Sequence, residues 1–221
     1  MNKLWCIVQK DLVAEWRARQ VWPRMLALGL AAGYLLSYQL SDSQMDLRLI
    51  AGSLCWLTVS VASMLALGQA VAVEHDEGCW DGLRQYPVGA ATIYLAKLAV
   101  NVVALGALQC VVVPMFVLMS GAALPHAGGV LIVSALGNLG ISAIGTLVGA
   151  MSSAVRQSQG LAAVLLLPLL VPLILAASKA TTLVFVGQMG AEWWRWVQLL
   201  GAFAVIYVTA GLVLFEFVIE E

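Results

Sequence analysis

The chain has 221 residues, of which 62% are hydrophobic and only 10% are charged, with a formal net charge of −1. Soluble domains carry about one quarter charged residues, so this composition excludes an ordinary water-soluble protein. The chain also holds no basic tract long enough to bind nucleic acid. We therefore interpret it as an integral membrane protein.

The first element in chain order is an amphipathic helix over residues 1–20. Its apolar residues Leu4, Val8, Leu12 and Trp16 recur at intervals of four, with polar and charged residues between them. A helix of this kind lies in the interface of the membrane, just before the first span. The alternative is a cytoplasmic extension whose basic residues only set the topology.

Six transmembrane helices are predicted after this segment. A spanning helix needs about 20 mostly apolar residues, so we divided the chain at its charged residues. The spans are expected at about 21–41, 49–73, 98–120, 130–151, 157–178 and 196–215. The third and fourth are separated by a turn that glycine and Pro125 mark. Residues 1–221 are thus expected to form a single all-α transmembrane domain.

The basic residues predict the orientation of these spans. With the N-terminus inside, eight basic residues fall on the cytoplasmic side and three, Arg48, Lys179 and Arg195, fall in outer loops. Basic residues are retained on the cytoplasmic side of a membrane protein. Both termini are therefore expected in the cytoplasm.

The largest predicted cytoplasmic loop, residues 74–97, is strongly acidic. Glu77 and Asp81 are four residues apart and would share one face of a helix, and Pro87 would begin a second turn or helix. A short charged helix in such a loop is typical of a docking element for a soluble partner. The alternative is a solvated connector.

No catalytic or cofactor-binding motif is found in the sequence. His75 and His126 have no second metal ligand at a suitable spacing, and no lysine follows a glycine as a phosphate-binding loop requires. The charge-free stretches also lack the ionisable group that a proton- or sodium-coupled carrier needs at the midplane. We expect a subunit without a catalytic site, a metal or a securely bound cofactor, which depends on a partner for energy.

Several residues inside the spans have more than one interpretation. Close helix packing explains the glycine pairs, and Pro168 and Pro172 would bend the fifth span. Trp193, Trp194 and Trp196 are expected in the interfacial belt. The polar residues that could either line a passage or bond between helices are Gln39, Gln69, Asn101, Gln109 and Asn138. The glycine pairs are Gly29 with Gly33 and Gly145 with Gly149.

Two stretches resemble a known family. The first runs from Glu74 through Gly78, Asp81, Gly82 and Pro87 to Lys97, and the second from Ala135 to Gly140 continues through Gly145 and Arg156 to Pro172. Both are similar to the haem exporter B subunit family, CcmB, of the cytochrome c maturation system. The resemblance covers nearly the whole chain.

The resemblance implies a type 2 ABC exporter fold, with six transmembrane helices, an N-terminal elbow helix and a coupling helix after the second span. The elbow would be the helix within residues 1–20. The coupling helix would dock on a cytoplasmic ATPase. The resemblance therefore implies an ATPase-coupling role for seven residues of this loop. These are Glu74, Glu77, Gly78, Asp81, Gly82, Arg84 and Pro87.

The resemblance also implies partners and a cargo. Similar proteins work in the bacterial inner membrane with an ATPase subunit (CcmA), a haem-handling membrane subunit (CcmC) and its small helper (CcmD). Together they load haem onto a periplasmic chaperone for attachment to c-type cytochromes. Two routes are possible. Haem passes through this subunit, or the neighbouring subunit handles haem and ATP hydrolysis releases the loaded chaperone from it. The lack of a haem ligand in this sequence favours the second route. The alternatives are a type 2 permease for a lipid or peptide, and a membrane scaffold that transports nothing.

Overall fold

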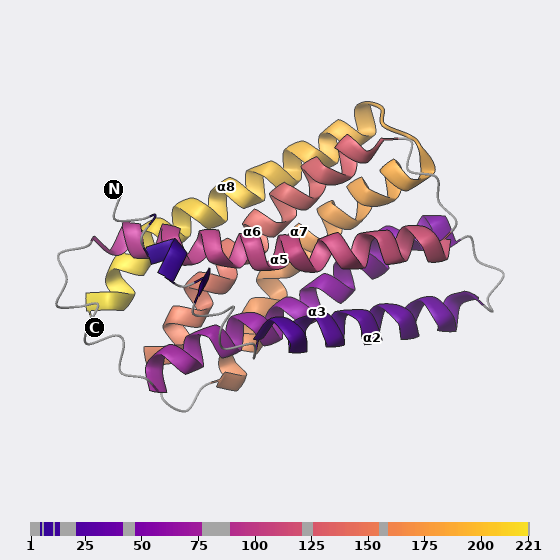
Figure 1. Ribbon diagram of the computed structural model, residues 1–221. Helices are drawn as coiled ribbons and strands as arrows, with labels where there is room; N and C mark the ends of the chain where they lie inside the picture. The colour runs from indigo at the N-terminus through magenta and orange to yellow at the C-terminus, as the bar shows by residue number, and fades with distance from the viewer. Residues whose placement is uncertain are drawn as a thin grey trace.

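The computed structural model describes residues 5, 7–10, 12–13, 21–41, 47–76, 89–120, 126–154 and 159–220. In this part of the chain the regular structure is entirely α-helical, which agrees with the predicted all-α class. The long helices, labelled in Figure 1, are α2 (Val21–Ser41), α3 (Leu47–Asp76), α5 (Ala90–Ser120), α6 (Ala127–Ala154), α7 (Gln159–Val186) and α8 (Ala191–Glu220).

Successive helices run in opposite directions along the bundle. Figure 1 shows that the described N-terminal residues, the ends of α3, α6 and α8, and the starts of α5 and α7 all lie toward one end. The ends of α2, α5 and α7 and the starts of α3, α6 and α8 lie toward the opposite end. We call the first of these the terminal end of the bundle.

Four of the helices are long and apolar enough to cross a membrane, when only the described residues are considered. The candidate spans are Ala90–Leu118, Ala127–Met151, Pro168–Val186 and Ala191–Phe217, and a shorter apolar helix covers Arg48–Met64. The first two predicted spans, 21–41 and 49–73, coincide with the helices α2 and α3, but many of their side chains lie outside the described set. A count of six spans therefore stays a prediction.

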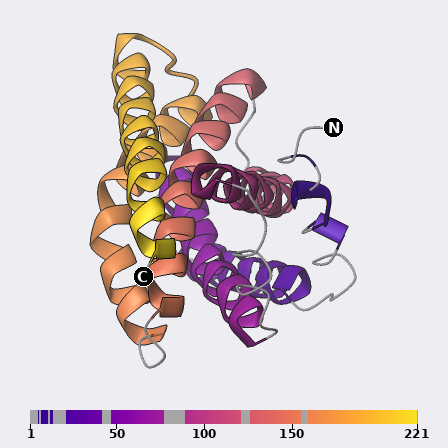
Figure 2. The same ribbon diagram turned by 90° about the vertical axis from the view of Figure 1, so that its left-hand side faces the viewer.

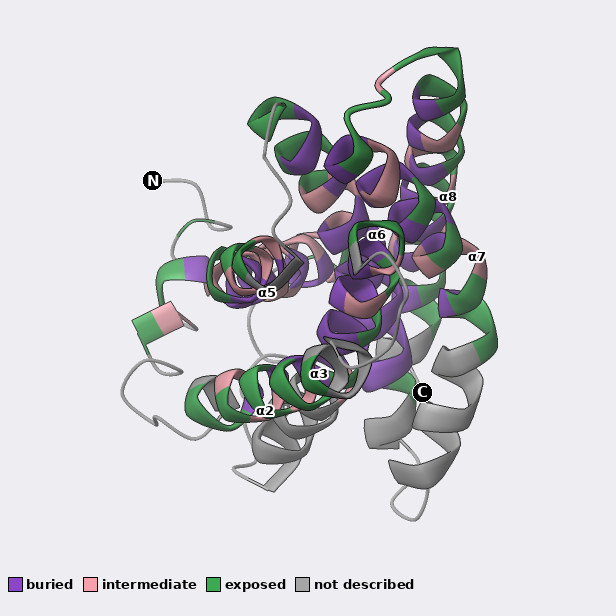
Figure 3. Ribbon diagram, turned by 90° about the vertical axis from the view of Figure 1, so that its right-hand side faces the viewer, coloured by how far each residue is buried: buried purple, intermediate pink, exposed green. Residues whose placement is uncertain are grey.

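Helix α6 is the centre of the bundle. It contacts α3, α5, α7 and α8, and 67% of its most apolar segment is buried, compared with 28% for α8. Figure 3 shows this difference as a mostly purple α6 beside green outer faces on α2 and α8.

Small residues allow the neighbouring helices to approach α6. A Cβ atom on Gly137 would overlap the ring of Trp56 on α3, and one on Gly140 would overlap Leu173 on α7. On the periphery, a Cβ atom on Gly29 would lie 2.9 Å from Leu108 of α5. A Cβ atom on Gly33 would lie 2.5 Å from Met115 of α5. The predicted close packing at Gly29 and Gly33 is thereby confirmed.

The two prolines of α7 lie inside a continuous helix. A proline leaves the carbonyl four residues before it without a helical donor, so Pro172 frees the carbonyl of Pro168. One residue further on, the hydroxyl of Tyr207 in α8 donates a hydrogen bond to the carbonyl of Leu169, at 2.5 Å. In this way α8 is tied to the segment of α7 that the prolines weaken.

The tryptophans near the start of α8 differ from one another in exposure. Trp194 is 55% exposed, as an interfacial residue should be, but Trp193 is only 1% exposed and its ring meets that of Trp194 edge to face at 5.0 Å. Trp193 thus faces the bundle, and the placement of the three tryptophans in an interfacial belt stays a prediction. The side chain of Trp193 points into the bundle because the helix turns by about 100° per residue, which places neighbouring side chains on different faces.

Gly137→Ala is expected to destabilise the bundle. The added methyl group would displace the Trp56 ring, and overpacking of this kind costs about 1–3 kcal/mol. Gly106→Ala is the matched control, because a Cβ atom there meets nothing within 4 Å and alanine favours the helix by about 1 kcal/mol. Unfolding in detergent followed by circular dichroism measures both variants. An unfolding midpoint of Gly137→Ala equal to that of Gly106→Ala would contradict the packing described here.

Candidate functional site

The site predicted from the sequence falls in the chain between α3 and α5, and the adjoining ends of these two helices lie at the terminal end of the bundle. Of its residues, Glu74 lies in the last turn of α3, which ends at Asp76. The other predicted ATPase-coupling residues lie outside the described residues: Glu77, Gly78, Asp81, Gly82, Arg84 and Pro87. The structure thus describes both ends of the segment 74–97 and places them at the same end of the bundle.

Helix α5 begins earlier than the predicted third span. Its first turn is closed by the carbonyl of Gly89, which accepts hydrogen bonds from the backbone N–H groups of Thr92 and Ile93. The helix then continues through Lys97, where the predicted loop was expected to end. The last turns of the predicted loop are therefore part of a long helix that reaches into the apolar bundle.

Tyr94, in the second turn of α5, connects this end of the chain to the bundle interior. It is fully buried, and its hydroxyl donates a hydrogen bond to the carbonyl of Ala143 in α6 at 3.1 Å. Its ring lies against Phe215 of α8, with centroids 5.4 Å apart, and Gly211 makes room for it. One side chain thus joins α5 to both α6 and α8 close to the predicted coupling loop.

The N-terminal segment packs on the same part of α5. Its described residues are helical, and Val8 is 6% exposed against Ala96 and Val100. Ile7 and Leu12 flank this contact. Figure 2, a view onto the terminal end, shows the segment beside the start of α5. The predicted apolar face is thus used by Val8 and Leu12, while the other residues of the predicted elbow, including Leu4 and Trp16, lie outside the described residues.

Polar contacts hold the middle of the bundle together. The indole N–H of Trp56 in α3 donates to the hydroxyl of Thr181 in α7 at 2.8 Å, and both side chains are buried. Thr181 in turn donates to the carbonyl of Ala177. One turn away, the hydroxyls of Ser53 and Ser178 lie 2.6 Å apart. These contacts join α3 to α7 across the bundle.

The polar residues singled out in the third and fourth spans bond to one another. The side-chain amide of Asn138 in α6 donates to Gln109 in α5 at 3.1 Å, and Asn101 donates to Thr146 at 2.8 Å. Between the two interpretations of these residues, the structure supports hydrogen bonds between helices. Gln39 and Gln69 have side chains outside the described set.

Sequence reasoning missed the pair of Trp56 and Thr181. A signal existed, because an indole N–H in the apolar interior must find an acceptor. The identity of that acceptor was not readable, since Thr181 is 125 residues away. Only the packing of α3 on α7 brings the two side chains together.

The described residues contain no group of three or more side chains suited to a metal ion. His126 is exposed at the end of the bundle opposite the termini, and the side chain of His75 lies outside the described set. The described contacts join the helices to one another, and Tyr94 links the start of α5 to α6 and α8.

Long apolar helices, packed in alternating directions and joined by buried polar pairs, define a multi-pass membrane protein. The family model described as CcmB protein matches residues 2–219, nearly the whole length, and the chain belongs to this family. The resemblance noted in the sequence is thereby confirmed. The family is one of permease subunits in the ABC-type haem export system of cytochrome c biogenesis. No curated protein matches the chain significantly.

Thr181→Val is expected to destabilise the protein although it preserves shape. The substitution leaves the indole N–H of Trp56 buried without an acceptor, which costs about 1–3 kcal/mol. Thr209→Val is the control, because Thr209 is exposed and also donates to a carbonyl of its own helix. Tryptophan fluorescence during detergent unfolding reports both effects. Equal unfolding midpoints for the two variants would show that the bond between Trp56 and Thr181 contributes nothing.

Proposed function

We propose that this chain is the membrane subunit of an ABC-type complex that delivers haem to a periplasmic chaperone during c-type cytochrome biogenesis. The observation that carries the proposal is the family match over residues 2–219. In this proposal a cytoplasmic CcmA-like subunit hydrolyses ATP, and a CcmC-like subunit with its CcmD-like helper handles haem. The chain contributes no catalytic site of its own.

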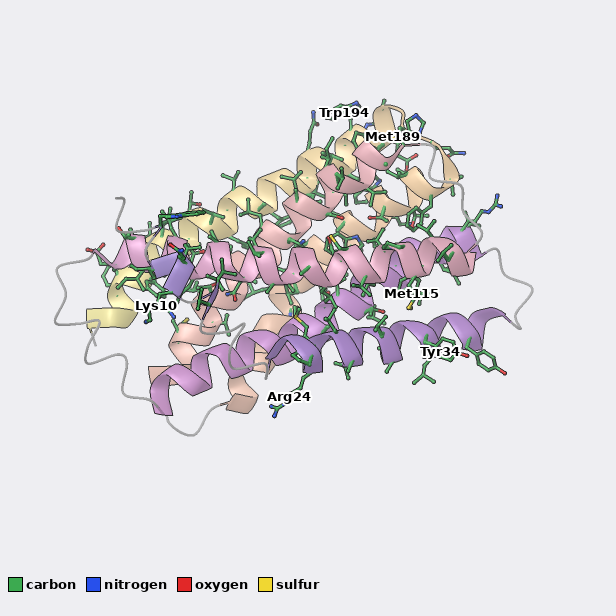
Figure 4. All side chains as sticks on the ribbon, in the orientation of Figure 1. Lys10, Arg24, Tyr34, Met115, Met189 and Trp194 are labelled. Atoms are coloured by element: carbon green, nitrogen blue, oxygen red, sulfur yellow. The ribbon has the colours of Figure 1, made fainter. Side chains whose placement is uncertain are left out.

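The placement of charges and aromatic residues supports an orientation in the bacterial inner membrane with both termini in the cytoplasm. Lys10 and Arg24 lie toward the terminal end, whereas Trp194 and Met189 lie at the opposite end (Figure 4). Basic residues are retained on the cytoplasmic side, and exposed indole rings favour the headgroup layer. The terminal end would then face the ATPase.

In this orientation the segment between α3 and α5 is the ATPase-coupling element. Both of its flanking helices enter the bundle directly, since α3 ends at Asp76 and α5 begins at Ala90. A displacement of the segment would move α5, and Tyr94 would pass that movement to α6 and α8. The contact of Val8 with Ala96 and Val100 would couple the N-terminal segment to the same movement.

Haem is proposed as the cargo of the complex rather than a group held inside this subunit. The amides of Gln109 and Asn138 form a hydrogen bond to each other between α5 and α6, and the described residues hold no group of three or more side chains suited to a metal ion. We therefore favour the route in which ATP hydrolysis releases the loaded chaperone from the haem-handling neighbour. The seven predicted coupling residues, from Glu74 to Pro87, would act in that step.

Deletion of the gene for this subunit is expected to abolish covalent haem in c-type cytochromes. The physical reason is that apocytochromes would receive no haem from the chaperone, whereas b-type cytochromes bind haem without this route. Haem staining of membrane proteins after denaturing electrophoresis measures the first class, and difference spectra measure the second. Normal c-type cytochromes in the deletion strain would exclude haem delivery and favour another permease substrate or a scaffold.

Reversing the charge at Glu77 and Asp81 together is expected to loosen the ATPase subunit without unfolding the bundle. The double variant Glu77→Lys with Asp81→Lys replaces attraction by repulsion at the proposed docking face, and each lost surface ion pair is worth about 0.2–1 kcal/mol. Co-purification in mild detergent gives the ATPase to permease ratio.

The control for this experiment is Glu192→Lys. Glu192 is exposed in the first turn of α8, at the end of the bundle opposite the termini. It should leave both the ratio and the ATPase activity unchanged. An undiminished ratio and activity in the double variant would remove the coupling role from Glu77 and Asp81.

A further inference from the structure

A ladder of polar side chains follows the contact between α5 and α6. Gln109 bonds to Asn138, and Asn101 bonds to Thr146. The two bonded residues on each helix are eight positions apart, so the helices are antiparallel and in register. The register set by these two bonds pairs the position of Ser142 on α6 with that of Leu105 on α5, midway along the ladder. We call this strip of side chains the α5–α6 seam.

The seam contains three polar atoms without a hydrogen-bond partner. They are the Nε2 atom of Gln109, the Oδ1 atom of Asn138 and the Oγ atom of Ser142. The residues are 4%, 4% and 0% exposed. A polar group that is buried without a partner costs far more than a single hydrogen bond contributes, and lipid offers no replacement. These atoms therefore need a ligand that comes from outside the side chains around them.

The chemistry of the three atoms selects the ligand. The amide nitrogen of Gln109 can only donate, the amide oxygen of Asn138 can only accept, and the hydroxyl of Ser142 can do either. A cation would be repelled by the N–H group, and an anion would be repelled by the carbonyl oxygen. Water donates and accepts at once, and buried waters typically make about three hydrogen bonds to such groups.

The spacing of the residues also fits water. Asn138 and Ser142 are one turn apart on the same face of α6, which corresponds to about 6 Å along the helix axis. One water with two hydrogen bonds of about 2.8 Å each bridges atoms about 4.5 Å apart, because the bonds meet near the tetrahedral angle, and side chains one turn apart that lean toward each other come within that distance. The side chain opposite them, Leu105, is 2% exposed and offers no polar atom that could replace the water.

We propose that the α5–α6 seam is a binding site for ordered water, held by Gln109, Asn138 and Ser142 in the interior of the bundle. The water completes the hydrogen bonding of the seam and bridges the amide pair to the hydroxyl. This inference concerns the described helices alone, and it holds whichever cargo the complex delivers.

X-ray hydroxyl-radical footprinting of the full chain in lipid nanodiscs tests the proposal directly. Radicals formed from a bound water label the adjacent side chain, so Leu105 is expected to be oxidised despite its burial. Leu200 of α8 is the control, because it is 0% exposed and no polar atom without a partner is found in its own turn. Labelling of Leu105 no greater than that of Leu200 would overturn the proposal.

The variant Ser142→Ala gives a second test, because its unfolding midpoint is expected to shift in opposite directions for a hydrated seam and for a dry seam. If water bonds to the hydroxyl, the variant loses that bond, so its midpoint of detergent unfolding falls and the labelling of Leu105 decreases. If the seam is dry, the variant removes a hydroxyl without a partner, so the midpoint rises. A rise in the midpoint would contradict the water site.

The double variant Gln109→Leu with Asn138→Leu removes both amides together. It leaves no half of the pair behind, so it is expected to fold, and the labelling of Leu105 should fall to the level of Leu200. Labelling that persists in this variant would assign the radicals to another source and overturn the role of the two amides. The single Ser142→Ala change keeps the test decisive if the double variant fails to fold.

Discussion

Polar groups in the interior of this bundle have to bond to the protein or to bound water, because lipid tails offer no hydrogen bonds. The bond from Trp56 to Thr181 meets this requirement between α3 and α7, and the amide pair of Gln109 and Asn138 meets it between α5 and α6. Close approach makes both possible, since Gly137 lies under the Trp56 ring beside Asn138. Helix α6 is central because it packs against α3, α5, α7 and α8.

The same contacts connect the terminal end of the bundle to its interior. Tyr94 lies just after the proposed coupling segment, yet it reaches a carbonyl of α6 and the ring of Phe215 in α8. The N-terminal segment adds Val8 to the same region of α5. A partner that acts on this end would therefore act on several helices together, as expected for a permease subunit of the CcmB family that depends on an external ATPase.

The membrane class and the family could both be read from the chain, and so could the helical character of the long apolar stretches. The start of α5 could not be predicted from the charges, because the helix already begins at Ala90 and runs through the charged residue Lys97. A lysine near a helix end can extend its charge toward water, so charge alone does not end a span. The exposures of Trp193 and Trp194 were also not distinguishable, since adjacent residues of the same type carry no signal of which faces the bundle.

The sequence by itself determined that this is a helical membrane protein and that it belongs to its family. Both could be predicted because hydrophobic length and local motifs are properties of neighbouring residues. Only the tertiary structure decided which polar residues pair and which remain without partners. Thr181 meets Trp56, and Asn138 meets Gln109, because separate helices pack in one register. That register depends on contacts between residues far apart in the chain, which no local pattern encodes.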